Sequence, residues 1–229
     1  MIPRPFISIS IRKLAISLLL LVSASASAQF KFFSIQKDSI PFFRGFAVSF
    51  DLVGVAMMEL SDYGQYEGAL RINLHDEWFP IVELGYGKAK HADDPVTLLR
   101  YETAAPYFRV GIDKNLLKQK HGPYRFYAGL RYAYTSYKVD LARDDFPDPY
   151  WKWNTGFGVK DEQCNYHWLE IALGADATIW GPLHLGWSVR YKRRIAHNDG
   201  ALGRTWYVPG FGVDNDSRLG GTFNVIIDI

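Results

Sequence analysis

The stretch Tyr124–Val139, YRFYAGLRYAYTSYKV, alternates with a period of two between an apolar column and a mixed column. The apolar column consists of Tyr124, Phe126, Ala128, Leu130, Tyr132 and Tyr134. The mixed column consists of Arg125, Tyr127, Gly129, Arg131, Ala133 and Thr135. Successive side chains of a strand point to opposite faces, so the two columns lie in different environments. Aromatic residues on one face, and arginine among small residues on the other, are typical of a barrel wall with lipid outside and a tight, charged interior.

The composition favours the same architecture. Apart from an apolar run near the N-terminus, no segment approaches the ~20 apolar residues of a membrane-spanning helix. A membrane protein without such helices must be a closed barrel, because only a barrel then satisfies every backbone polar group in lipid. The aromatic share of 16% and the 20 glycines agree with a wall of this kind.

Residues 1–28 have the three parts of a secretion signal. A basic start is followed by the short apolar run Leu14–Val22 and by small residues that end in Ala26-Ser27-Ala28, an A-x-A cleavage pattern. The basic residues are Arg4, Arg12 and Lys13. A run of about nine apolar residues is too short for the alternative, a membrane anchor. We therefore expect a cleaved signal peptide over 1–28 and one domain over 29–229.

Removal of this signal leaves a chain that is close to neutral. The full chain has 26 Lys and Arg and 24 Asp and Glu, and the signal holds three basic and no acidic residues, so 23 basic residues face 24 acidic ones, a net charge of −1. This balance gives no support to nucleic-acid binding. Cys164 is the only cysteine, so no internal disulfide can form, and we expect a loop thiol without a function.

Eight segments share the alternation of two columns, and we expect each to be a strand. They are Arg44–Leu52, Tyr66–Leu74, Trp78–Gly87, Pro106–Lys114, Tyr124–Val139, Tyr166–Ile179, Leu183–Arg193 and Arg218–Ile229. Three connections are long, Lys88–Ala105, Asp140–Asn165 and Ile195–Ser217, one around Glu59–Gln65 is moderate, and the others are shorter. This rhythm predicts an all-β fold, an eight-stranded antiparallel up-and-down transmembrane β-barrel with short periplasmic turns and longer outer loops. The alternative is a soluble, lipocalin-like periplasmic carrier, in which the apolar columns would face inward.

With an export signal, eight strands and a strand that runs to the last residue, the chain resembles the small outer-membrane barrels of Gram-negative bacteria. The SASASA segment before Gln29 and the tyrosine-rich strands look most like an uncharacterised barrel family from Bacteroidetes. The resemblance implies a location in the cell outer membrane, with outer-membrane lipid and the barrel assembly machinery as partners. That machinery reads a last strand that often ends in an aromatic residue, whereas this one ends in Ile229 with Phe223 further in. The resemblance implies no functional residues.

Charged residues recur in the inward columns of the predicted strands. An eight-stranded barrel is only wide enough inside for its own side chains, so the buried charges must pair. We therefore predict an ion-pair network that fills the lumen, formed by Glu83, Arg109, Arg131, Glu170 and Arg190. A proton or ion path would need continuous water, which so narrow a barrel lacks. Hydrolysis by Glu83 and Glu170 as paired carboxylates is a further alternative, but the sequence does not set their separation.

Two residues at the predicted rim suggest an enzymatic alternative. Barrels that edit lipid A keep a histidine and a serine near the outer rim, and here His167 and Ser136 lie on neighbouring strands with the same parity. As base and nucleophile they would make a lipid A hydrolase or acyltransferase. No third, orienting group is identifiable, so we expect no enzyme. The histidines lack metal-ligand spacing, and no helix follows Gly200–Gly203 to make a phosphate loop, so we expect no metal and no cofactor.

Aromatic residues in the outer loops and at the strand ends complete the pattern. We expect Trp151, Trp153, Trp206 and Tyr207 to contact a surface partner or a small ligand, although these loops could instead pack as a lid over the barrel mouth. The strand ends predict two interfacial girdles. Their members are Trp78, Tyr124 and Trp180 at one level and Tyr66, Tyr86, Tyr107, Tyr134, Tyr166 and Tyr191 at the other. The sequence thus predicts an outer-membrane barrel with a structural or binding role.

Overall fold

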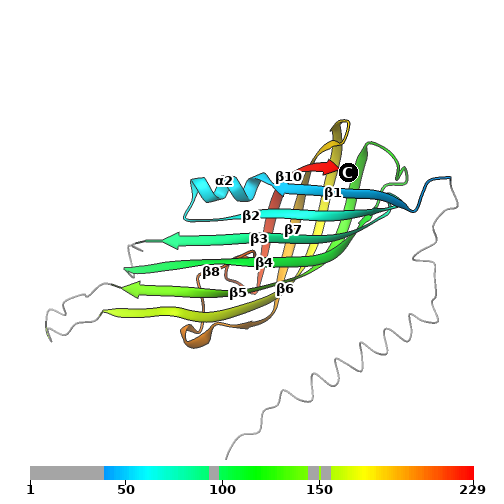
Figure 1. The fold of residues 1–229 in the computed structure, drawn as a ribbon. Helices are drawn as coiled ribbons and strands as arrows, with labels where there is room; N and C mark the ends of the chain where they lie inside the picture. Colours follow the sequence, from blue (N-terminus) through cyan, green and yellow to red (C-terminus); the bar gives the residue numbers. More distant parts are fainter. Residues whose placement is uncertain (1–38, 93–97, 144–149, 151–155) are drawn as a thin grey trace, which may run out of the picture. The chain divides into compact units, whose positions relative to one another are not determined.

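Eight antiparallel strands close into a barrel in the computed structural model, which describes residues 39–92, 98–143, 150 and 156–229. Around the wall the order is β1-β10-β7-β6-β5-β4-β3-β2 (Figure 1). The wall strands are β1 (Phe43–Asp51), β2 (Tyr63–Leu74), β3 (Trp78–His91), β4 (Leu99–Asn115), β5 (Tyr124–Arg143), β6 (Phe157–Trp180), β7 (Leu183–Asn198) and β10 (Ser217–Asp228). The predicted fold class is confirmed. The residues of the predicted signal peptide lie outside the described residues.

The two columns of Tyr124–Val139 lie on opposite faces of β5, as their alternation predicts. Leu130 keeps 53% of its surface exposed on the outside, whereas the neighbouring Arg131 is 1% exposed inside the barrel. Large apolar side chains are exposed on the outer face of the other strands too, among them Val48, Leu70, Leu84, Val110, Ile171, Trp187 and Ile227. So broad an apolar exterior is matched by lipid and not by water. The outer face is therefore the lipid-facing wall of a transmembrane barrel.

The wall strands on one side of the barrel are longer than the sequence pattern indicates. β5 has 20 residues and β6 has 24, while a membrane-crossing strand needs only about 9–11. The predicted loop Lys88–Ala105 is wrong in its extent, because β3 continues to His91 and β4 begins at Leu99. The predicted loop Asp140–Asn165 likewise contains the start of β6. In Figure 1 these strands reach further to the left than β2 does.

A helix replaces the outer half of the first strand, where the sequence indicates only a loop. Helix α2 (Leu52–Leu60) starts at Asp51, whose carboxylate accepts hydrogen bonds from the backbone N–H groups of Val53 and Gly54, both at 3.1 Å. This is a helix N-cap. Gly54 lets the helix lie against the backbone of β2, because a Cβ at this position would collide with the carbonyl oxygen of Gln65. Among the described residues, no helix is long and apolar enough to cross a membrane.

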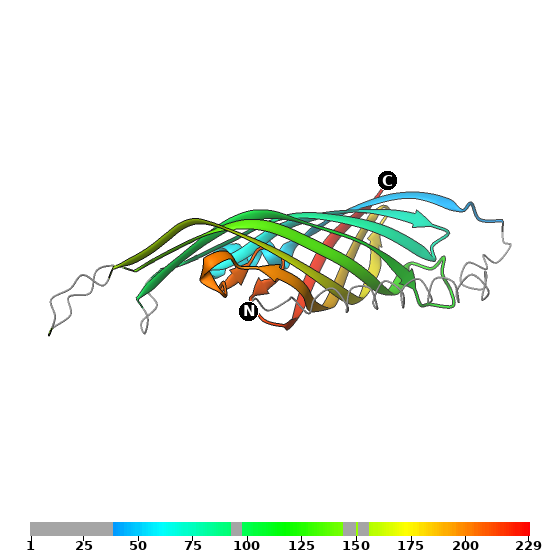
Figure 2. The ribbon, with the colours of Figure 1, turned by 90° about the horizontal axis from the view of Figure 1, so that it is seen from below.

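The connection between β7 and β10 folds back into the barrel. We call residues 199–215 the plug; it contains the 3-10 helix η1 (Gly200–Leu202) and the short strands β8 (Tyr207–Val208) and β9 (Gly212–Val213), which pair with each other. Figure 2 shows this segment, in orange, within the curve of the wall. Its side chains join the main core cluster: Tyr207 is 2% exposed and Phe211 is 1% exposed.

Burial in the plug corrects one sequence prediction. Tyr207 is not an exposed contact residue, because its ring lies in the core and its hydroxyl donates to the carbonyl oxygen of Gly64 at 3.3 Å. The alternative of a loop packed over the barrel mouth describes this segment better. The sequence signal was ambiguous because an aromatic residue next to proline and glycine is equally compatible with an exposed loop and with a buried turn.

Candidate functional site

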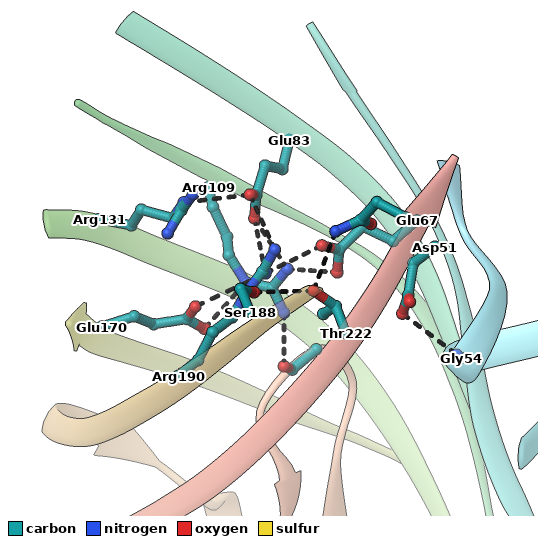
Figure 3. Close-up of polar contacts among 12 residues, drawn as sticks. Asp51, Gly54, Glu67, Glu83, Arg109, Arg131, Glu170, Ser188, Arg190 and Thr222 are labelled. Atoms are coloured by element: carbon teal, nitrogen blue, oxygen red, sulfur yellow. Dashed lines mark hydrogen bonds and ion pairs between the residues drawn. The ribbon is translucent and has the colours of Figure 1, made fainter. Parts of the chain in front are cut away.

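Three carboxylates and three guanidinium groups meet in the middle of the barrel and form what we call the central network. Its members are Glu67, Glu83, Arg109, Arg131, Glu170 and Arg190, and Figure 3 shows them pointing toward one another from six different strands. Every one of these residues is buried. Each of the strands β2 to β7 contributes one member of the central network, from the column of alternate residues that faces inward.

Arg109 of β4 contacts all three carboxylates. Its Nη1 atom forms ion pairs with Glu67 and, at 3.1 Å, with Glu83, while its Nε atom lies 2.9 Å from Glu170. Its Nη2 atom donates a hydrogen bond of 2.8 Å to the carbonyl oxygen of Gly210. Arg109 thus connects the wall network to the plug.

The other two arginines complete the arrangement. Nη1 of Arg190 lies 2.9 Å from both Glu67 and Glu83, and its Nη2 donates to Glu83 at 3.1 Å. The Nε atom of Arg131 lies 3.0 Å from Glu83. Arg131 is directly opposite Glu170 in the β5–β6 register, yet its second ion pair is with Asp113, at 2.9 Å. The five residues predicted for a lumen network are therefore brought together, with Glu83 bound by all three arginines.

Sequence reasoning left out the groups that support these charges. The hydroxyl of Tyr107 donates to Glu67 at 2.7 Å, and the indole Nε1 of Trp168 donates to Glu170 at 2.6 Å. Tyr107 fits because Gly85 on the neighbouring strand has no Cβ to collide with its ring. The inward glycine therefore makes room for a polar aromatic residue. Placement inside the barrel also excludes Tyr107, and the equally buried Tyr166, from the predicted girdles.

A second layer of ion pairs lies next to the central network. Arg71 lies 2.6 Å from Asp176 and 3.7 Å from Asp113, with its guanidinium carbon 4.9 Å from the ring centre of Tyr127. Together with Lys192, the two layers hold five buried carboxylates and five buried cations, so their formal charges cancel. They are Glu67, Glu83, Asp113, Glu170 and Asp176 against Arg71, Arg109, Arg131, Arg190 and Lys192. A void of about 10 Å³ between the layers has room for about one water molecule.

This geometry closes the lumen. Side chains that are 0–1% exposed, such as Arg109 and Glu83, fill the cross-section, as expected for eight strands. The carboxylates are each occupied by arginine, which leaves none of them free to act as a general base. The arrangement can hold the wall and the plug together, and the described residues contain no cluster of side chains suited to a metal ion.

A separate cluster fastens the tight turns at the other end of the barrel. The carboxylate of Asp76 accepts from the Nδ2 of Asn73 at 2.6 Å, lies 2.7 Å from Nδ1 of His121 and forms an ion pair with Arg44 at 3.3 Å. Partial burial acts to raise the pKa of Asp76, but the hydrogen bonds from His121 and Asn73 and the charge of Arg44 hold it below its usual value. This one carboxylate thus joins the β2–β3 turn, the β4–β5 connection and the start of β1.

At the opposite end, an aromatic pocket opens between the long strands and the plug. We call this the rim pocket; it has a volume of about 330 Å³. Its lining consists of His91, Leu99, Tyr101, Leu141, Leu202, Arg204, Thr205 and Trp206. The ring of Trp206 lies 5.1 Å from His91, 5.6 Å from Tyr101 and 5.9 Å from Tyr63. Of the predicted loop contacts, Trp206 is thus half-buried beside a cavity, while Trp151 and Trp153 lie outside the described residues.

The structure does not assemble the predicted histidine and serine pair. Ser136 is opposite Asn165 in the β5–β6 register, and His167 is opposite Tyr134. The Nδ1 atom of His167 lies 2.6 Å from the hydroxyl of Tyr132. That partner is on the lipid-facing column, and among the described residues no hydrogen bond joins His167 to Ser136.

The fold and the network define a class, a closed eight-stranded transmembrane barrel whose lumen is filled by ion pairs and a plug. The chain belongs to the family "Domain of unknown function (DUF6048)", whose model matches residues 7–228. A comparison with curated proteins finds no match. Among solved structures, the chain is similar to the crystal structure of neisserial surface protein A, with 11% identity over 82% of this chain and 99% of that one, at a TM-score of 0.45.

Proposed function

We propose that this protein is an outer-membrane barrel that does not conduct ions and that binds a small ligand in the rim pocket. The apolar outer wall supports a location in a membrane. The signal peptide predicted over 1–28 and the short turns at one end support the outer membrane, with the longer connections outside. We also propose that the protein comes from Bacteroidetes. The barrel assembly machinery would recognise it through β10.

The observation that carries the binding role is an open aromatic pocket over a closed lumen. The central network and the plug leave no continuous water path through the described residues, which argues against a pore. The rim pocket, by contrast, is within the size range of ligand sites, about 300–1,000 Å³. It combines the ring of Trp206 with the guanidinium of Arg204, whose side chain is 64% exposed although its Nε atom pairs with Asp214 at 3.2 Å, so a ligand would share this arginine with Asp214. An aromatic molecule with an anionic group matches these two features.

Two measurements test the membrane part of the proposal. The full chain in outer-membrane fractions should migrate differently on a denaturing gel before and after boiling, because a closed barrel resists the detergent until it is heated. In planar lipid bilayers it should produce no conductance steps. Recovery in the soluble fraction without a mobility shift would overturn the anchoring, and regular conductance steps would overturn the closed lumen.

The ligand part is tested with phenylacetate as the probe, using saturation-transfer NMR on protein in lipid nanodiscs. Trp206→Ala should reduce the apparent affinity at least roughly tenfold, because buried aromatic anchors dominate such sites. The matched control is Trp187→Ala, which removes a tryptophan from the lipid-facing column. Equal saturation transfer in wild type and Trp206→Ala would overturn the rim pocket as the site.

A further inference from the structure

The barrel wall has a seam, between β1 and β10, that its strands close only in part. β1 and β10 pair only from Ala47 opposite Asp228 to Asp51 opposite Asn224, because the chain leaves the wall as helix α2. Phe46 and Ile229 exchange both backbone hydrogen bonds, at 3.0 and 2.7 Å. In an antiparallel pair this pattern repeats at every second residue. The odd-numbered residues of β10 therefore present their N–H and C=O groups toward the seam.

Three residues of β10 lack a backbone partner on the seam side, and for two of them the described residues offer no hydrogen-bond partner at all there. The N–H of Phe223 is satisfied by the Oδ1 atom of Asp51 at 3.1 Å. For the next two odd positions, Gly221 and Leu219, the described residues offer no hydrogen-bond partner on the seam side. Leu219 is 68% exposed on the lipid-facing column. Unpaired backbone groups within a membrane-spanning wall are costly, so an occupant that can hydrogen bond would stabilise this edge.

A cavity lies directly behind this edge. It has a volume of about 400 Å³ and lies between α2, the plug and the inner face of β10. Its lining includes Met57, Tyr63, Lys192, Phe211, Arg218 and Gly220. We call it the seam cavity. Apolar walls from the helix and the plug, with polar groups on one side, are suited to a molecule that is apolar along most of its length.

The glycine pair beside the cavity is not required by packing within the protein. A Cβ at Gly220 would come no closer than 3.4 Å to the Cε of Lys192, and one at Gly221 no closer than 3.8 Å to the carbonyl oxygen of Ser188. Both are ordinary contact distances. Glycine weakens a strand interior, and the close approach of a ligand is one of the reasons for which strands retain it, beside bulges and tight bends.

The charges at the cavity favour an anion. The Nζ of Lys192 bonds to the carbonyl oxygens of Gly210 and Phe211 and lies 4.0 Å from Glu170, its nearest carboxylate. Arg218 donates to the carbonyl oxygen of Val213 at 3.2 Å and forms no ion pair with a described carboxylate. The one acidic residue in the lining, Asp51, is occupied by three backbone N–H groups.

We propose that the seam cavity binds an acyl chain with an anionic head group, which enters sideways from the membrane between α2 and β10. The chain lies against Met57 and Phe211, and the head group meets Arg218 and the free backbone groups of Gly221. This inference rests on the membrane anchoring proposed above but not on the rim pocket. A free fatty acid and an anionic phospholipid share the required chemistry.

Photo-crosslinking of the full-length protein in phosphatidylcholine vesicles tests the site. The probes are a fatty acid and a phosphatidylglycerol, each with a diazirine in its acyl chain. We expect adducts concentrated on α2 and β10 that are lost on competition with unlabelled fatty acid or phosphatidylglycerol. The probe that gives the competed adducts identifies the source. Adducts spread evenly over the lipid-facing wall, or not reduced by competition, would overturn the proposal whatever the variants do.

Two matched glycine variants, one that fills the seam cavity and one that lies away from it, test whether the cavity is the binding site. Gly220→Leu places a side chain in the cavity and should reduce the adducts at least roughly tenfold, while Gly158→Leu, where an added Cβ meets nothing within 4 Å, should leave them unchanged. Undiminished adducts in Gly220→Leu would contradict the site. Heat-modifiable mobility of each sample separates loss of the site from loss of the barrel.

The head group is tested separately. Arg218→Gln should weaken crosslinking of the fatty acid roughly tenfold, because it removes the positive charge that the anionic head group meets and hydrogen bonds to charged groups are the stronger ones. Crosslinking of the matching fatty alcohol should not change. An equal effect of Arg218→Gln on the acid and the alcohol would show that the cavity does not select an anion.

Discussion

The β5–β6 pair and the β1–β10 pair are built from the same alternating sequence pattern, yet they close the wall to very different extents. β5 and β6 pair from Tyr124 opposite Ala177 to Arg143 opposite Phe157, well beyond the lipid-facing belt. β1 and β10 stop at Asp51 opposite Asn224. The difference follows from one break in periodicity, where the alternation of β1 gives way to the continuous apolar run of α2. It shows that one barrel can have full-length strand pairing on one side and only short strand pairing, beside a helix, on the other.

The largest effect is expected from a variant that disrupts the central network, which the two sides of the barrel share. Arg109→Leu leaves three buried carboxylates with fewer cations and should lower the free energy of unfolding by about 3–5 kcal/mol. Urea unfolding in vesicles, followed by the mobility shift, measures it. The control is Lys138→Met on the long β5 strand, whose exposed pair with Asp161 should contribute less than about 1 kcal/mol. Similar losses in both variants would contradict the dominance of the buried network.

A smaller effect is expected where β1 ends. Asp51→Ala removes the N-cap of α2 and the acceptor for the backbone N–H of Phe223. It should lower the free energy of unfolding by about 1–2 kcal/mol, measured by the same urea unfolding. Asp140→Ala is the control on the long side, where the carboxylate accepts a single exposed hydrogen bond from Asp161. Equal stability of Asp51→Ala and wild type would mean that the seam does not depend on this carboxylate.

The smallest effect is expected at the end of the barrel that carries the tight turns, where neighbouring strands pair around the whole wall. Asp76 has a lowered pKa in the folded protein, so its contribution is fully present above its unfolded pKa of about 3.9 and is lost as the pH falls through the lower folded value. When the pH is lowered from 5 to roughly below 4, the free energy of unfolding of wild type should therefore fall more than that of Asp76→Asn. Unfolding curves at several pH values measure this difference, and parallel curves would contradict it.

Much of the wall could be predicted from the chain because its cause is local. Alternation at period two places Leu130 outside and Arg131 inside without reference to any other strand. The inward position of Glu83, Arg109 and Glu170 follows in the same way. Their pairing could be predicted only as a necessity of burial, since which carboxylate meets which arginine depends on the stagger of six strands.

The elements that sequence reasoning missed have causes that lie elsewhere in the fold. The outer part of β5 shares a core cluster with the plug, because Tyr137 and Val139 lie in it together with Tyr207 and Phe211. The burial of Tyr207 involves residues far away in the chain: its hydroxyl donates to the carbonyl oxygen of Gly64, and the hydroxyl of Tyr101 donates to the carbonyl oxygen of Tyr207 itself. The capping of α2 by Asp51 has a sequence signal, an aspartate before an apolar run, but the alternation of β1 concealed it.

By itself, the sequence determined that this chain forms an eight-stranded barrel with an apolar exterior and a charged interior, because side-chain parity along a strand is a property of the strand alone. Only the tertiary structure decided that the lumen is closed by the plug and by mutually paired charges. It alone also decided that one seam stays open beside α2. These features depend on distances between residues far apart in the chain, and those distances are set only when the ring of strands closes.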